Sequence, residues 1–190
     1  MSGGGLVSTV ETDWLYLKAS LPELPDYLLS VELFWPLTLP GVELPRLTVG
    51  GLLLARTRLR AVAMFPTEEA KLMPLEQQMM SIRSRWLAAW ERKVMQEAHA
   101  RLDLWKNYLT DYLHAPDQYA DAYPQEVRWR AMLHLLLAEL AARVPEHAAL
   151  MKLDIQLRAS LLPSAFIWEP EFVPGFPQDQ YWFLYGRLKV

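Results

Sequence analysis

The sequence predicts a mainly α protein, a bundle of four to six helices around one long central helix. Three observations lead to this prediction. Apolar residues recur at helical spacing from about 74 to 114, no glycine or proline interrupts residues 75–114, and 52% of the 190 residues are hydrophobic. That composition allows one substantial core, so we expect a single helical domain over residues 1–190.

The central helix is predicted from apolar positions separated by three or four residues over about ten turns. They are Leu75, Met79, Ile82, Trp86, Trp90, Val94, Ala98, Leu102, Trp105, Leu109 and Tyr112. Pro74 suits a first helical turn, and the Ala115-Pro116 pair favours a helix end. At 1.5 Å per residue such a helix spans about 60 Å, so we expect it to form a spine for the other helices.

The N-terminal part is predicted to be extended, because five prolines punctuate residues 21–45. Asp26 is a candidate N-cap for one or two helical turns within this segment. The same segment carries large apolar residues, so we expect it to be docked on the helices rather than to act as a free linker. Residues 6–17 are the candidate partner for a strand at the C-terminus.

Residues 49–64 are predicted to form a helix capped by Thr48, with an apolar stripe through Leu52, Ala55, Leu59 and Val62. Two glycines, at 50 and 51, weaken this prediction. The alternative is a strand over residues 52–62, with Arg56, Arg58 and Arg60 alternating outward. A short helix that begins at Thr67 is expected to lead into the spine.

The C-terminal third is predicted to hold two more helices and an extended tail. Pro124 and Pro145 open the helices, and Pro163 ends the second one. Residues 164–180 contain three further prolines among aromatic residues, which favours an irregular, proline-rich wrap. Residues 181–190 alternate as a strand does, so we expect a small terminal β-ribbon.

Composition excludes several functional classes. The chain has no cysteine, which removes thiolate catalysis and cysteine-ligated zinc. Charged residues or prolines interrupt every apolar run, so we expect no membrane contact, and residues 1–5 lack the pattern of a secretory signal. The expected location is therefore cytoplasmic. The net charge is −3, yet residues 51–115 carry ten basic and seven acidic side chains.

Catalytic and metal-binding motifs give little support for an enzyme, and we expect no cofactor. The sequence has no Walker loop, no dinucleotide-binding glycine motif, no His-Glu zinc motif and no serine nucleophile elbow. His99 and Asp103 lie four residues apart on the predicted spine and form a weak metal candidate. A third ligand would have to come from His134 or His147 on another helix. A metal-dependent helical enzyme is the least favoured hypothesis.

Nucleic-acid binding is the second hypothesis, because arginines cluster on the two central elements. The candidates are Arg56, Arg58, Arg60, Arg85 and Arg92. Guanidinium groups neutralise phosphates, and the interleaved tryptophans could stack on unpaired bases. However, those tryptophans fall on the apolar stripe of the spine. Arg101 also follows Glu97 by four residues, the favourable orientation for an ion pair within a helix.

The leading hypothesis rests on a surplus of aromatic residues, which make up 12% of the chain. Many lie in the proline-rich tail and the terminal strand, and they either fix these segments to the bundle or anchor a protein interface. The candidate interface residues are Trp168, Phe172, Phe176, Tyr181, Trp182 and Tyr185. We therefore expect a non-catalytic interaction subunit or adaptor of a cytoplasmic assembly, whose partners are other protein chains or further copies of itself.

Overall fold

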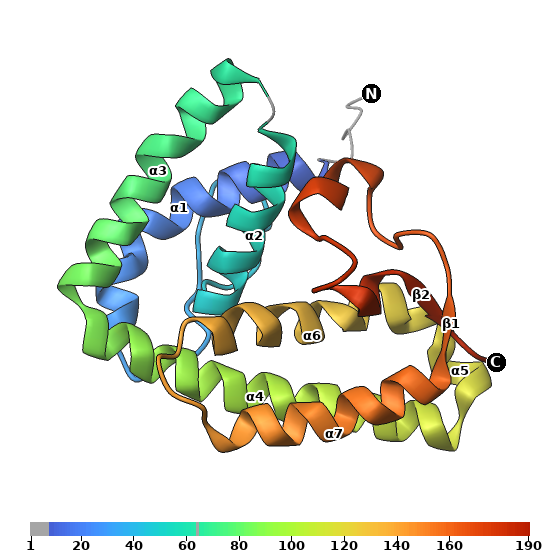
Figure 1. Ribbon diagram of the computed structural model, residues 1–190. Helices are drawn as coiled ribbons and strands as arrows, with labels where there is room; N and C mark the ends of the chain where they lie inside the picture. Colours follow the sequence, from blue (N-terminus) through green and yellow to red (C-terminus); the bar gives the residue numbers. More distant parts are fainter. Residues whose placement is uncertain (1–7, 64) are drawn as a thin grey trace.

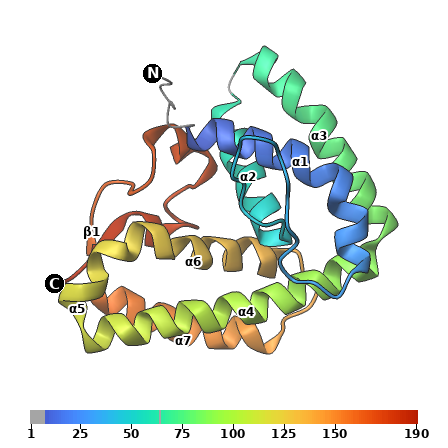
Figure 2. The same ribbon diagram turned by 180° about the vertical axis from the view of Figure 1, so that it is seen from behind.

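The computed structural model describes residues 8–63 and 65–190. These residues form seven α-helices, three short 3₁₀ helices and one two-stranded antiparallel sheet. Figures 1 and 2 show α4, α6 and α7 lying side by side at one end of the molecule, with α1, α2 and α3 at the other. The prediction of a mainly α bundle with a small terminal β-ribbon is confirmed.

Helix α1 runs from Thr9 to Leu29, which corrects the prediction of an extended N-terminal segment. Pro22 and Pro25 lie inside this helix, where each removes a backbone donor. The helix survives because Leu17, Leu21, Leu24 and Leu28 form a buried stripe along it. Asp26 is therefore an interior helical residue rather than an N-cap. Residues 9–17 are helical, so they do not pair with the C-terminal strand, and Leu6 lies outside the described residues.

An irregular segment follows α1 and passes in front of α2 in the view of Figure 2. Isolated bridges join Trp35 to Leu47 and Leu39 to Val42, and Gly41 adopts a positive φ of 75° at the turn between the last two. Proline-rich, extended structure is thus confirmed for residues 33–47 alone. Helix α2, Val49–Val62, is a helix as predicted, and the Thr48 side chain caps it by accepting from Gly51 N–H at 3.0 Å.

The predicted spine is two helices, α3 (Pro66–Arg85) and α4 (Leu87–His114). The chain leaves the helical region at Trp86, with φ −118° and ψ 37°, and α3 turns away steeply from α4 (Figure 1). Pro66 opens α3, whereas Pro74 lies inside it. The apolar spacing continues across Trp86 because both helices bury a stripe. The spacing of apolar residues therefore cannot reveal the change in backbone conformation at Trp86 that turns the chain from α3 into α4.

The later helices follow the predicted punctuation by proline. After the short α5 (Pro116–Tyr119) and the 3₁₀ turn η1 (Ala120–Ala122), Pro124 lies in the first turn of α6, Tyr123–Ala138. Helix α6 packs against α4 and α2 and contributes Val127, Ala131, Leu133 and Leu136 to the core. Helix α7, Pro145–Ser160, packs on the outer side of α4.

The C-terminal tail is mostly irregular, as predicted, with 3₁₀ turns η2 (Pro170–Gly175) and η3 (Trp182–Leu184). Only Gly186–Leu188 forms strand β2, and its partner is β1, Leu161–Pro163. The expected ten-residue terminal strand is therefore wrong in extent and in partner. Strand β1 directly follows α7, and the returning tail brings β2 beside it (Figure 1).

Candidate anion-binding pocket

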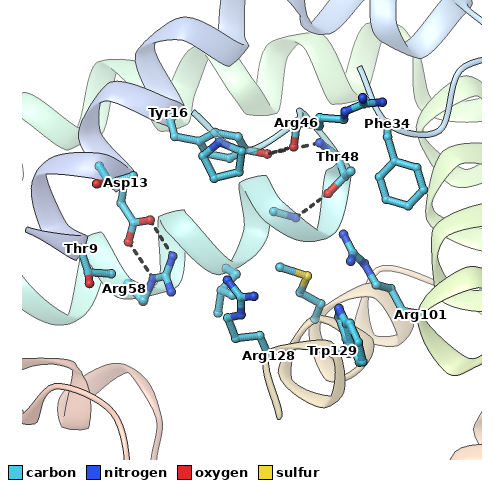
Figure 3. Close-up of a pocket in the computed structure, with 15 residues that line it drawn as sticks. Thr9, Asp13, Tyr16, Phe34, Arg46, Thr48, Arg58, Arg101, Arg128 and Trp129 are labelled. Atoms are coloured by element: carbon cyan, nitrogen blue, oxygen red, sulfur yellow. Dashed lines mark hydrogen bonds and ion pairs between the residues drawn. The ribbon is translucent and has the colours of Figure 1, made fainter. Parts of the chain in front are cut away.

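A cavity of about 410 Å³ lies between α1, α2, α4, α6 and the segment that precedes α2 (Figure 3). Its polar lining comes from four arginines, one carboxylate, three threonines and one tyrosine. These residues are Arg46, Arg58, Arg101, Arg128, Asp13, Thr9, Thr12, Thr48 and Tyr16. Four guanidinium groups against one carboxylate give the lining a formal charge of +3. This excess distinguishes the cavity from the chain as a whole, whose net charge is −3.

Asp13 is paired with Arg58. Arg58 donates from Nε at 2.7 Å and from Nη2 at 2.6 Å to the two carboxylate oxygens, in a bidentate arrangement. Burial raises the pKa of Asp13, and the Arg58 charge partly offsets this rise. The pair fixes the Arg58 guanidinium at one end of the pocket, as Figure 3 shows.

Arg101 is held by a buried carboxylate behind the pocket wall. Glu97 is fully buried, and its two oxygens accept from Arg101 Nε at 3.2 Å and from Gly50 N–H at 2.8 Å. This contact confirms the predicted Glu97–Arg101 helical pair. Position 50 needs glycine, because a Cβ atom there would lie 2.6 Å from Glu97 Oε1. The Arg101 guanidinium also lies over the Phe34 ring, 5.4 Å from its centroid.

Arg128 points into the cavity from α6 (Figure 3). Its Nε donates to the Gln125 carbonyl oxygen at 2.9 Å, which leaves the two terminal nitrogens of the guanidinium for other partners. Partial burial lowers the pKa of Arg128, the like charges of Arg58 and Arg101 lower it further, and the Glu126 carboxylate opposes this shift. The three arginines therefore repel one another across the cavity. An anion placed between them would relieve this repulsion.

The N-terminus of α2 borders the same cavity. The Tyr16 hydroxyl accepts from Thr48 N–H at 3.2 Å and donates to the Arg46 carbonyl oxygen at 3.2 Å. This bridge ties α1 to the start of α2, and burial raises the pKa of Tyr16. The N-terminus of a helix carries partial positive charge, and at α2 the Glu97 carboxylate and the Thr48 hydroxyl accept from the N–H groups of Gly50 and Gly51.

The remaining lining of the cavity is apolar. It consists of Phe34, Pro45, Leu54, Trp129 and Met132, with Gly51 between them. The pocket thus joins a basic part to an aromatic and aliphatic wall, a combination typical of small-molecule sites. It is also of a typical size for such a site.

The five arginines proposed for nucleic-acid contact do not form one surface. Arg56 and Arg60 both pair with the buried Glu76, at 2.7 and 2.6 Å. Arg92 donates to the Leu28 carbonyl oxygen, and the Arg85 guanidinium lies over the Trp86 ring. Of the five, only Arg58 lines the basic pocket.

The six aromatic residues proposed for a protein interface pack largely on one another and on the helices. Phe172, Phe176 and Tyr181 are buried, and the other three are partly buried. The Trp168 indole N–H donates to the Pro124 carbonyl oxygen at 2.8 Å, and the Tyr185 hydroxyl donates to the Phe176 carbonyl oxygen at 2.7 Å. In this conformation their main contacts fix the tail to the bundle.

His99 and Asp103 lie on the surface of α4, with His99 Nε2 3.8 Å from the Asp103 carboxylate and Nδ1 3.5 Å from Glu146. His134 and His147 lie elsewhere, at a separate cavity between α6 and α7. Across residues 8–63 and 65–190, no group of three or more histidine or acidic side chains is arranged to hold a metal ion. Within the same ranges, no helix is long and apolar enough to cross a membrane.

Comparison with protein-family models, with curated proteins and with solved structures found no match to this chain. The pocket itself is therefore the basis for a functional interpretation. Among the arginines of the pocket, the sequence predicts Arg58 as a nucleic-acid candidate and Arg101 as the ion-pair partner of Glu97, and it gives no signal for Arg46 or Arg128. These four residues come from four separate segments, and no spacing pattern connects them.

Proposed function

We propose that this protein binds a small anionic ligand in the basic pocket. The observation that supports the proposal is the convergence of Arg58, Arg101 and Arg128 on a cavity whose only lining carboxylate, among the described residues, is Asp13. Each guanidinium is already oriented by a partner, so binding would order few side chains. Charge-assisted hydrogen bonds from arginine to an oxyanion are among the strongest polar contacts in proteins.

The test is isothermal titration calorimetry with inorganic phosphate at low ionic strength. Arg128→Gln removes the central guanidinium and is expected to weaken phosphate binding by about tenfold or more. The matched control is Arg60→Gln, which makes the same charge change on the other side of α2, where Arg60 pairs with Glu76. Equal affinities in these two variants would contradict the proposal, because long-range charge alone would then account for binding.

The role of a non-catalytic interaction subunit remains a second proposal, and an exposed face of α3 favours it. Met73 and Met80 are two turns apart and thus on one face of the helix, and they are 46% and 42% exposed. A partner protein that covers them with apolar side chains would remove this area from water. Native mass spectrometry of the protein recovered from its own cells tests the idea. Assembly that is unchanged by Met73→Glu and Met80→Glu together would exclude this face.

A further inference from the structure

The pocket has a basic wall and an aromatic and aliphatic wall, and α6 contributes residues to both. On α6, Arg128 is followed by Trp129, and Met132 lies one turn further along, so all three side chains face the cavity. In Figure 3 the Trp129 indole lies beside Arg101, and Arg128 extends into the cavity from the same helix as Trp129. A ligand that contacts Arg128 would therefore also meet an aromatic ring.

Trp129 differs from the two tryptophans buried within α4. Trp90 and Trp105 are completely enclosed by the core, whereas Trp129 is only partly buried and lines the cavity. A tryptophan that keeps part of its ring in a cavity can take up a planar ligand ring by stacking. Phe34, at the same end of the cavity, already packs with the Arg101 guanidinium.

The arginines favour a tetrahedral anion over a planar one. Arg58, Arg101 and Arg128 come from α2, α4 and α6, so they approach the cavity from three different helices. A carboxylate has two oxygens in one plane and suits one bidentate arginine, as the Asp13–Arg58 pair shows. A phosphate monoester presents three terminal oxygens in different directions and carries more than one negative charge at neutral pH. It can accept from several guanidinium groups at once.

We infer that the ligand is a phosphate monoester of a planar aromatic group. The phosphate lies among Arg58, Arg101 and Arg128, and the ring packs on Trp129 and Met132. This inference rests on the proposed function, since it names the class of anion that the same pocket takes. The cavity volume of about 410 Å³ suits one small molecule of this kind.

Calorimetry with three probes separates the phosphate from the ring. The probes are inorganic phosphate, phenyl phosphate and cyclohexyl phosphate, and the last has a ring of similar size that is not planar. Stacking on an aromatic side chain predicts that phenyl phosphate binds about tenfold more tightly than inorganic phosphate, and also more tightly than cyclohexyl phosphate. Equal affinities for phenyl and inorganic phosphate would overturn the inference about the ring.

Two variants locate the ring. Trp129→Leu is expected to remove the preference for phenyl phosphate over inorganic phosphate, and Trp129→Phe is expected to retain most of this preference. Circular dichroism and thermal melting identify any loss of folding in Trp129→Leu, in which case the comparison of Trp129→Phe with wild type across the three probes decides. A phenyl preference that is undiminished in a folded Trp129→Leu variant would overturn the assignment to Trp129.

The same measurements keep the two proposals apart. If inorganic phosphate binds and Arg128→Gln weakens it, yet phenyl phosphate gains nothing, the anion pocket stands and the aromatic ligand is wrong. If none of the three probes binds to the wild-type protein, both the proposed function and this inference fail.

Discussion

The two sides of α2 use arginine in opposite ways. Arg56 and Arg60, four residues apart, face α3 and share the carboxylate of Glu76. Arg58 lies between them in the sequence and faces the other way, toward α1 and the basic pocket. Both sides have a buried carboxylate and a cavity. Arg56 and Arg60 are the only arginines in the described lining of one cavity, whereas Arg101 from α4 and Arg128 from α6 join Arg58 in the basic pocket.

The local ratio of charges, rather than the number of arginines, separates the structural site at Glu76 from the proposed binding site at the pocket. On the α3 side, both oxygens of Glu76 accept from the two arginines, and the guanidinium groups lie along a helix interface. On the pocket side, Asp13 is fully occupied by Arg58. Arg101 faces the same cavity and pairs with Glu97 behind its wall, whereas Arg128 donates to the Gln125 carbonyl oxygen and has no carboxylate partner among the described residues. An anionic ligand would supply the missing charge.

The largest expected effect is on stability, from Glu76→Gln. This change leaves Arg56 and Arg60 without their shared buried carboxylate, and we expect the free energy of unfolding to fall by about 2–3 kcal/mol. The loss is smaller than for a fully buried pair, because Arg56 and Arg60 are 29% and 59% exposed. Urea denaturation measures the change. Glu68→Gln, which affects an exposed pair with Lys71, serves as the control and should cost less than about 1 kcal/mol.

The second prediction concerns the pocket side. Asp13→Asn removes the carboxylate that competes for Arg58, so phosphate should bind about fivefold more tightly in calorimetry. Glu76→Gln is the matched control, since it removes a carboxylate of similar burial on the other side of α2 and should leave phosphate affinity nearly unchanged. Weaker phosphate binding in Asp13→Asn would show that the Asp13–Arg58 pair is needed to position Arg58 for the ligand.

The third prediction is a pH dependence that arises from Asp13. Its pKa lies above the ordinary value of 3.8 in the folded protein because the carboxyl is buried, with Arg58 opposing the rise and Glu169 adding to it. Between the two pKa values the folded state binds more protons than the unfolded state. The contribution of Asp13 to the free energy of unfolding therefore falls as pH rises through this window.

This pH effect is isolated by comparison with Asp13→Asn, which cannot titrate at that position. The free energy of unfolding of the wild type minus that of the variant should decrease as pH rises from 3.8 through the folded-state pKa, and then level off. Denaturant titrations over the acid range measure it. A difference that increases with pH in this window would mean that pairing with Arg58 outweighs burial.

The smallest expected effect comes from Arg60→Ala. Arg60 is 59% exposed, and Arg56 remains beside Glu76 in the variant. We expect a loss below about 1 kcal/mol in the free energy of unfolding and no change in phosphate affinity. A loss as large as that of Glu76→Gln would show that Arg60 alone neutralises Glu76. Glu76 would then form a simple ion pair with Arg60 rather than a carboxylate shared with Arg56.

Part of the fold was predictable because its signals are local. Thr48 caps α2, Pro124 and Pro145 open α6 and α7, and Glu97 pairs with Arg101 one turn away, and all of these depend on residues within four positions of one another. Helix α1 was missed because the packing of its leucine stripe outweighs the cost of two prolines. That gain depends on α2 and α3, which lie elsewhere in the sequence.

The candidate site was not predictable in the same way. Arg46, Arg58, Arg101 and Arg128 are separated by 12 to 43 positions, and only the packing of α1, α2, α4 and α6 brings them to one cavity. The sequence also could not show which arginines would be neutralised. Nothing near Glu76 or Asp13 in the sequence indicates that helix packing will place them beside Arg56 and Arg58.

Composition and local sequence patterns are enough to predict the mainly helical class, the starts of several helices, the absence of cysteine chemistry and the excess of basic residues in the middle of the chain. These properties follow from composition and from contacts within one helical turn. The break at Trp86, the inward packing of the aromatic tail and the grouping of arginines around one pocket arise only from contacts between distant segments. Each of these depends on which surfaces of distant segments meet, a choice made by burial across the whole chain.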